Sequence, residues 1–270
     1  MNTVLVTGAN GFVGRALCDR MMRDGWSVRG AVRYPDDRLR LPKEVEAIVI
    51  GDIGPDTDWS LTLQGIDAVV HLAARVHVMH DAERDPLSVY RFVNTKGTER
   101  LARMAAQAGI RRFVFLSSIK VNGEETHSAA FTESVVVPPK DPYALSKWEA
   151  EEVLRHIAKE TKLETVIVRS PLVYGPGVRA NFFSLLRAVN RGLPLPFGAF
   201  KNQRSLIYVG NLVDALMTCL THPRASAETF VVSDHDDVST SELVRRIAYA
   251  FGKRSHLLSV PRSFFYSSVF

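Results

Sequence analysis

The sequence predicts an α/β fold, in which a doubly wound parallel sheet is followed by a small C-terminal lobe. Three observations support this prediction. Short β-branched runs alternate with helical patterns over the first two thirds of the 270 residues, a glycine-rich turn follows the first run, and proline and glycine become frequent after Arg169. Short apolar strands separated by helices are typical of a parallel sheet that is covered on both faces.

Six apolar runs are expected to form the strands of this sheet. They are Thr3–Thr7, Val28–Val32, Ala47–Ile50, Ala68–Leu72, Phe113–Ser117 and Thr165–Arg169. Helical patterns between them cover Phe12–Asp24, Leu87–Ala108 and Tyr143–Glu160. Ligands of such sheets bind outside the carboxyl ends of the strands, so functional residues are expected there.

The change of composition after Arg169 predicts two domains. Residues 1–170 are expected to form the first domain, and residues 171–270 the smaller lobe. The stretch 206–222 has a strand-and-helix pattern that is expected to return to the first domain.

Composition excludes several classes of protein. With 46% hydrophobic and 23% charged residues, the chain is neither disordered nor fibrous. No apolar run approaches the roughly 20 residues of a membrane span, and the N-terminus lacks the basic and apolar regions of a signal peptide, so we expect a cytoplasmic protein. The net charge of +5 is too mild and dispersed to indicate nucleic-acid binding.

Cysteine and histidine usage predicts neither a disulfide framework nor a metal site. Cys18 and Cys219 are two isolated cysteines without zinc spacing. His71 ends an apolar strand, while His77 and His80 lie in the loop beyond it. We therefore expect no bound metal.

The glycine-rich turn predicts dinucleotide binding. Gly8, Gly11 and Gly14 follow the first strand and open the first helix. Gly8 permits a tight turn, Gly11 lets the backbone approach a pyrophosphate, and Gly14 lets the helix pack closely on the strand. The free N–H groups at the helix N-terminus then face the phosphates. A purely structural strand-to-helix turn is the alternative.

The ends of the second and third strands carry charged residues that could choose the cofactor. Arg33 stands where an acidic residue usually binds the ribose of NAD, and a guanidinium there could hold the 2′-phosphate of NADP. Alternatively, Arg33 pairs with Asp36 or Asp37 on the surface. Asp52 and Ile53 follow the third strand, where Asp52 could bind the adenine edge or cap a turn. NAD(P) is the expected cofactor, with NADP slightly favoured.

Three residues form a candidate catalytic set. Tyr143 and Lys147 are four residues apart at the start of a helix, which places them on one face. A nearby ammonium lowers the pKa of a tyrosine from about 10, and so lets it move protons at neutral pH. Ser118, at the carboxyl end of the fifth strand, could bind a substrate oxygen, with Ser117 as the competing neighbour.

Six motifs in order resemble one enzyme family. TGANGFVG, VVHLAA, VNTKGT, FLSSIKVNG, YALSK and RSPLVYGPG resemble the extended short-chain dehydrogenase/reductases, and most closely the nucleotide-sugar 4-epimerases and 4-reductases that act on UDP-glucose or UDP-N-acetylhexosamines. The resemblance runs from about Thr3 to Gly252. It implies a Rossmann domain with a small C-terminal substrate lobe, a Ser118–Tyr143–Lys147 triad, and a homodimer.

The resemblance also implies binding residues. Besides Arg33, Asp52 and Ile53 at the strand ends and the triad's Tyr143 and Lys147, those expected at the cofactor are Gly8, Asn10, Gly11, Phe12, Val13, Gly14, Leu72, Ala73, Ala74, Asn94 and Pro171. Those expected at the nucleotide sugar, together with Ser118, are Asn181, Leu195, Pro196, Phe197 and Arg204. Each residue of the second lobe has an alternative: Asn181 as a helix cap, Phe197 as core and Arg204 as a surface charge.

The implied activity is oxidation or reduction at C4 of a UDP-sugar, as an epimerase or a 4-reductase. Ile119 and Lys120 replace the acidic pair of the related 4,6-dehydratases, which argues against dehydration, and Asn122 replaces a usual tyrosine. The chain ends at Phe270 without the family's second diphosphate-binding arginine, so we expect either a truncated chain or a reduced substrate lobe. As given, the chain is expected to bind UDP weakly. The alternatives are an NADPH-dependent reductase of small ketones or aldehydes, and a non-catalytic cofactor sensor.

Overall fold

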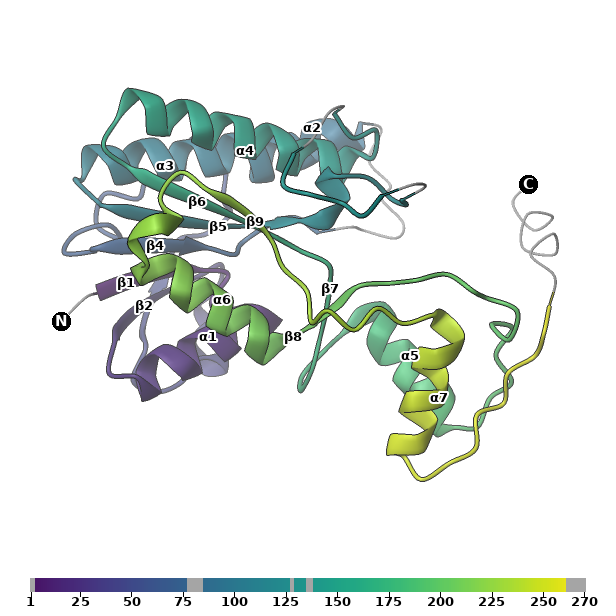
Figure 1. Ribbon diagram of the computed structural model, residues 1–270. Helices are drawn as coiled ribbons and strands as arrows, with labels where there is room; N and C mark the ends of the chain where they lie inside the picture. The colour runs from purple at the N-terminus through teal and green to yellow at the C-terminus, as the bar shows by residue number, and fades with distance from the viewer. Residues whose placement is uncertain (1–2, 77–84, 127–128, 135–137, 261–270) are drawn as a thin grey trace. The chain divides into compact units, whose positions relative to one another are not determined.

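The computed structural model describes residues 3–76, 85–126, 129–134 and 138–260 (Figure 1). The chain forms two compact units. Unit 1 takes in Met1–Pro171 and Val209–Val232, and unit 2 takes in Leu172–Tyr208 and the chain from Ser233 onward. The chain therefore passes between the units three times.

Unit 1 is built on one parallel sheet with the strand order β3-β2-β1-β4-β5-β6-β9 among the described residues. Its strands are β1 (Thr3–Thr7), β2 (Ser27–Val32), β3 (Glu46–Val49), β4 (Ala68–His71), β5 (Arg112–Ser118), β6 (Glu164–Ser170) and β9 (Thr229–Val231). The order reverses between β1 and β4, which is the position where such sheets bind ligands at their carboxyl edge.

Helices cover both faces of this sheet (Figure 1). Helices α1 (Phe12–Arg23) and α6 (Val209–Thr221) pack together on one face, and α3 (Gly97–Gln107) and α4 (Pro142–Glu160) on the other. The shorter helical segments of unit 1 are α2 (Pro86–Tyr90), the π-helical turn Arg91–Lys96, and the 3₁₀ turns Pro35–Arg40, Ile119–Val121 and Pro223–Ala225. The predicted helix over 87–108 is therefore helical throughout but contains a π-helical turn.

The main core lies between the sheet and the α3–α4 layer. Phe113 and Phe115 of β5 are fully buried there, together with Leu101 of α3, Leu154 of α4 and Trp59. Burial of a large apolar side chain contributes about 1.5–3 kcal/mol, so this cluster fixes α4 against β5. The contact matters because both elements carry candidate catalytic residues.

Unit 2 is small. It contains a two-stranded parallel sheet of β7 (Leu172–Tyr174) and β8 (Leu206–Tyr208), with helices α5 (Ala180–Asn190) and α7 (Thr240–Ala250) side by side (Figure 1). Its core is formed by Val189 of α5 and by Val244, Ile247 and Ala248 of α7. In the part of the chain that the structure describes, no helix is long and apolar enough to span a membrane.

Candidate active site

The turn between β1 and α1 has the geometry that a bound pyrophosphate requires. Gly8 has φ of +65°, and a Cβ added there would lie 2.9 Å from the backbone nitrogen of Ala73. A Cβ on Gly14 would lie 2.2 Å from the carbonyl oxygen of Gly8, so α1 can seat on β1 only with glycine there. Gly11 caps α1 without a side-chain hydrogen bond, and the first turn holds no acidic residue. The N–H groups and positive dipole end of α1 therefore suit an anion, and this turn fits a dinucleotide.

The segment after β4 is joined to this turn through Thr7. The Thr7 hydroxyl accepts hydrogen bonds from the backbone N–H groups of Leu72 and Ala73, both at 3.2 Å. Ala74 follows directly, so the expected cofactor residues 72–74 lie beside the glycine turn. The carboxyl ends of β1 and β4 thus form one continuous edge.

His71 is a structural residue of this edge. Its Nδ1 lies 2.6 Å from the Thr7 hydroxyl, and its Nε2 lies 3.0 Å from the Thr98 hydroxyl. Because Thr98 donates its own proton to the carbonyl of Asn94, it must accept from Nε2, which makes His71 the neutral Nε2–H tautomer. Burial and the nearby Lys147 lower the pKa of His71 to about 3. Both ring nitrogens of His71 are hydrogen-bonded within the protein. His77 and His80, in the loop after this strand, lie outside the described residues.

Asn94 lies in the π-helical turn and is buried. Its amide oxygen accepts from the backbone N–H of Arg75 at 2.8 Å, and its amide nitrogen donates to the Arg75 carbonyl and the Ser146 hydroxyl, both at 3.0 Å. The side chain therefore ties the segment after Ala74 to α4. A contact of Asn94 with the cofactor stays a prediction.

Arg33 and Asp52, the two charged residues predicted at the adenosine end, pair with each other. The Nε of Arg33 lies 2.9 Å from Oδ1 of Asp52. The side chains are 53% and 71% exposed, so this is a surface ion pair of low strength that a ligand phosphate could open. The partner of Arg33 in the structure is thus Asp52, rather than Asp36 or Asp37.

Ser118 and Tyr143 meet at the carboxyl end of β5. Ser118 is the last residue of β5, and Tyr143 is in the first turn of α4, which Asp141 caps by accepting from the N–H of Ala144. Burial raises the pKa of Tyr143 to about 12, a hydrogen bond with Ser118 lowers it, and Asp141 and Tyr90 raise it further. In the protein alone, Tyr143 is therefore a protonated phenol, and Ser118 acts to lower its pKa.

Lys147 lies one turn further along α4 and is 2% exposed. Its Nζ donates to the carbonyl of Leu116 at 2.7 Å and stands 3.9 Å from the centre of the Phe115 ring. Burial lowers the pKa of Lys147 to about 7, while Glu151 raises it. In the protein alone, the Lys147 amine thus contacts β5 and burial dominates the pKa of Tyr143. The lowering of that pKa by Lys147 stays a prediction.

Apart from Ser118, the expected sugar-nucleotide residues belong to unit 2. Asn181 is exposed and is the second residue of α5, whose N-cap is Arg179, so Asn181 is not the helix cap. Arg204 is exposed, and its backbone pairs with Val238 in an isolated bridge. Leu195 and Phe197 pack on the α5–α7 core, with Pro196 between them in the sequence. For Phe197 this is the alternative role, as a core residue, that the sequence left open.

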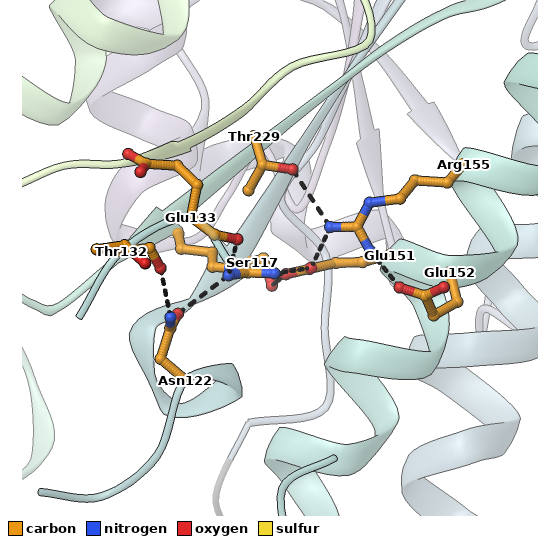
Figure 2. A network of polar contacts seen from close by, with 9 residues as sticks. Ser117, Asn122, Thr132, Glu133, Glu151, Glu152, Arg155 and Thr229 are labelled. Carbon is orange, nitrogen blue, oxygen red and sulfur yellow. Dashed lines mark hydrogen bonds and ion pairs between the residues drawn. The ribbon is translucent and has the colours of Figure 1, made fainter. Parts of the chain in front are cut away.

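Sequence reasoning missed a buried polar network next to the catalytic set (Figure 2). Ser117, Asn122, Glu151 and Arg169 form its centre. One signal for it was available, because Glu151 follows Lys147 by four residues and so shares its helix face. The charged Arg169 in an apolar strand was a second signal.

Comparison with known proteins identifies the family. The model of the NAD dependent epimerase/dehydratase family matches residues 4–233. A UDP-glucose 4-epimerase of Vibrio cholerae is 47% identical over 265 residues, covering 96% of this chain and 79% of the relative. A UDP-glucose 4-epimerase of Mycolicibacterium smegmatis is 31% identical and covers 92% of this chain and 82% of that protein.

Solved structures agree in fold. The UDP-glucuronic acid 4-epimerase of Bacillus cereus, in complex with UDP-glucuronic acid and NAD, superposes with a TM-score of 0.82 at 26% identity, covering 96% of this chain and 87% of that one. MoeE5 in complex with UDP-glucuronic acid and NAD gives a TM-score of 0.81 at 29% identity, with 96% and 85% covered.

Proposed function

This chain belongs to the NAD dependent epimerase/dehydratase family, and from that membership we propose that it oxidises or reduces C4 of a UDP-linked sugar. The observation that carries the proposal is the grouping of Ser118, at the carboxyl end of β5, with Tyr143 and Lys147 on successive turns of α4, where Ser118 lowers the pKa of Tyr143. The UDP-glucose 4-epimerase relative, at 47% identity over nearly the whole chain, supports the choice of a UDP-sugar.

The chain's own residues would divide the work as follows. Tyr143 exchanges a proton with the oxygen on C4 of the sugar, and Ser118 holds that oxygen by a hydrogen bond. Lys147 supplies positive charge, which favours the phenolate that Tyr143 must form. When bound, the nicotinamide accepts or supplies the hydride. Oxidation at C4 would give a 4-keto sugar, and return of the hydride to its other face would give the epimer. A 4-keto sugar that arrives from another enzyme would instead be reduced at the expense of NAD(P)H.

Residues of unit 1 would hold the cofactor. The turn from Gly8 to Gly14, with Asn10, Phe12 and Val13, offers backbone N–H groups to the pyrophosphate, and residues 72–74 border the same edge. Lys147 and Pro171 are proposed at its nicotinamide end, and Asp52 with Ile53 at its adenine end. We propose Asn181, Arg204 and the Leu195–Phe197 segment as the uridine-diphosphate contacts of unit 2, because an exposed arginine and an amide suit a diphosphate.

Product analysis tests this proposal. The protein is incubated with UDP-glucose, UDP-N-acetylglucosamine and their 4-keto forms, each with NAD(H) and NADP(H), and the products are identified by NMR. We expect inversion at C4 or reduction of the 4-keto group in at least one mixture. Turnover of small ketones alone, with no UDP-sugar altered, would contradict the proposal.

We further propose that the protein works in the cytoplasm as a homodimer. Nucleotide sugars and nicotinamide cofactors are the ligands proposed for it, and both are handled in that compartment. Light scattering coupled to size-exclusion chromatography is expected to give about 60 kDa, twice the 30.1 kDa of one chain. A mass of one chain at micromolar concentration would contradict the dimer.

A further inference from the structure

A buried ion pair lies next to Lys147, and the proposed chemistry does not use it. Glu151 of α4 is 0% exposed, and Arg169 of β6 is 1% exposed. Arg169 donates from Nη2 to Oε2 of Glu151 at 2.6 Å and from Nε to Oε1 at 3.0 Å. Burying two charges is costly unless both are paired and hydrogen-bonded, so such a pair next to a catalytic lysine calls for a reason.

Both carboxylate oxygens of Glu151 are fully engaged (Figure 2). Oε1 also accepts from the Ser117 hydroxyl at 2.6 Å, and Oε2 from Nη2 of Arg155 at 3.0 Å. Arg155 is itself paired with Glu152. The two glutamates and two arginines of the network (Glu151, Glu152, Arg155 and Arg169) are therefore neutral as a group. The member that lies one helical turn from Lys147 is the negative one, Glu151.

Arg169 extends the network to the loop after Ser118. Its Nη1 donates to Oδ1 of Asn122 at 3.1 Å and to the carbonyl of Glu133 at 2.9 Å. Asn122 in turn donates to the carbonyl of Thr132 at 2.5 Å. The guanidinium is therefore used on every side and cannot turn away from Glu151 without breaking these contacts.

The same network touches the catalytic lysine through β5. The carbonyl of Leu116 accepts from Lys147, and the next residue, Ser117, donates to Glu151. Two consecutive residues of β5 thus hold two residues of α4 that are one turn apart. The following residue of the strand is Ser118, so the network also sets where Ser118 stands relative to Tyr143.

Among the charged and titratable groups around Lys147, Glu151 is the one that favours the protonated amine. On β4, the ring of His71 is neutral. On α4, Tyr143 is a protonated phenol, and on β6 the charge of Arg169 is paired with that of Glu151. Burial lowers the pKa of Lys147 to about 7 and Glu151 raises it. At neutral pH the lysine is therefore close to losing its proton.

We propose that Glu151 is a positioning residue for Lys147: its carboxylate, locked between Ser117 and Arg169, keeps the buried amine protonated. The inference rests on the proposed function only in taking Lys147 as part of the catalytic set. Arg169 acts one step further back, by holding Glu151 in place.

Direct titration of Lys147 tests this inference without any substrate. The protein is labelled with ¹³Cε-lysine, and the Lys147 signal is assigned by its loss in Lys147→Arg. In Glu151→Gln, which keeps the shape and removes the charge, we expect the acid dissociation constant of Lys147 to rise about tenfold. The matched control is Glu152→Gln, which removes a charge from the next, half-exposed position. This variant should leave the pKa of Lys147 unchanged.

A second variant covers the case in which Glu151→Gln leaves Arg169 unpaired and does not fold. Glu151→Gln combined with Arg169→Met removes both charges, and such replacement of a buried pair is often tolerated. The pKa of Lys147 should fall in this double variant too, but by less, because a positive charge is removed together with the negative one. An unchanged Lys147 titration in whichever variant folds, or an equal shift in Glu152→Gln, would overturn the inference.

Activity gives an independent reading. In Glu151→Gln, the alkaline limb of the kcat/KM profile should move to lower pH by about the same amount as the pKa of Lys147. Glu151→Asp keeps the charge, so its alkaline limb should lie close to that of the unaltered protein. If the unaltered protein turns over no nucleotide sugar, the proposed function fails. The titration still decides the role of Glu151 in that case.

Discussion

At the residue scale, the site depends on a few side chains whose ionisation is set by burial. Burial shifts Tyr143 and Lys147 away from the charged forms that the proposed reaction needs, with pKa values of about 12 and about 7 in the protein alone. The Ser118 hydrogen bond and the Glu151 carboxylate act in the opposite direction. A cationic nicotinamide, if bound beside Tyr143 as proposed, would add positive charge there and so lower the pKa of the phenol.

Tyr143→Phe should remove proton transfer and keep the ring in place. Loss of a general acid or base typically costs roughly 10²–10⁴ in rate, so we expect turnover to fall by that factor. Cofactor affinity, measured by fluorescence titration, should change little and serves as the control. Turnover at the unaltered rate would remove Tyr143 from the mechanism.

Arg33 is predicted to favour NADPH over NADH. Its ion pair with Asp52 is exposed, so a 2′-phosphate can displace the carboxylate and gain charge-assisted hydrogen bonds of about 1.5–3 kcal/mol. Arg33→Ala should erase most of this preference and leave NADH affinity nearly unchanged. Equal or tighter binding of NADH by the unaltered protein, in the same titration, would refute the prediction.

His71 predicts acid sensitivity with a defined sign. The unfolded chain binds a proton at this residue below pH 6.5, whereas the folded protein does so only near pH 3. The free energy of unfolding should therefore fall, as the pH drops from 6.5 towards 3, by up to about 1.4 kcal/mol per pH unit. Urea titrations at several pH values measure this slope, and His71→Gln should flatten it. A slope that His71→Gln leaves unchanged would contradict the assignment.

At the element scale, strands and helices meet at the carboxyl edge of the sheet of unit 1. The strand order reverses between β1 and β4, and their ends are joined through Thr7 and His71. Helix α4 is held on β5 by apolar packing and by the Lys147 and Glu151 contacts. These joints explain why residues from distant parts of the sequence form one edge.

Gly14→Ala should break the joint between α1 and β1. The added Cβ would lie 2.2 Å from the carbonyl oxygen of Gly8, which is backbone and cannot move aside cheaply. We expect cofactor binding to fall at least tenfold, with lower thermal stability. Gly25→Ala is the control: its φ of +77° adds strain, but nothing lies within 4 Å, so it should reduce stability and spare cofactor affinity. Equal cofactor affinity in both variants would contradict this role for Gly14.

At the scale of the whole molecule, the sequence predicted unit 1 better than unit 2. All six expected strands match the observed bounds within one residue at each end, because apolar runs buried on both faces leave a clear pattern. The strand β9 was missed, since three half-buried residues carry no such pattern. It joins the sheet through its backbone pairing with β6.

The candidate site was predictable to the extent that its residues follow strands or a helical spacing. Ser118, Tyr143 and Lys147 were found in this way, and the structure brings Ser118 and Tyr143 together. The Glu151–Arg169 pair was not predicted, because charged residues in a sequence are normally taken for surface and only packing shows that these are buried.

The central claim is redox chemistry at C4, and the fate of the C4 hydrogen tests it most directly. A UDP-sugar that turns over in the product assay, prepared with deuterium at C4, is incubated with the protein and the cofactor, and both products are analysed by NMR. We expect the deuterium to pass to the nicotinamide or to return to C4, with none released to water. Release of the C4 deuterium to solvent, or reaction at another carbon while C4 keeps its configuration and label, would contradict it.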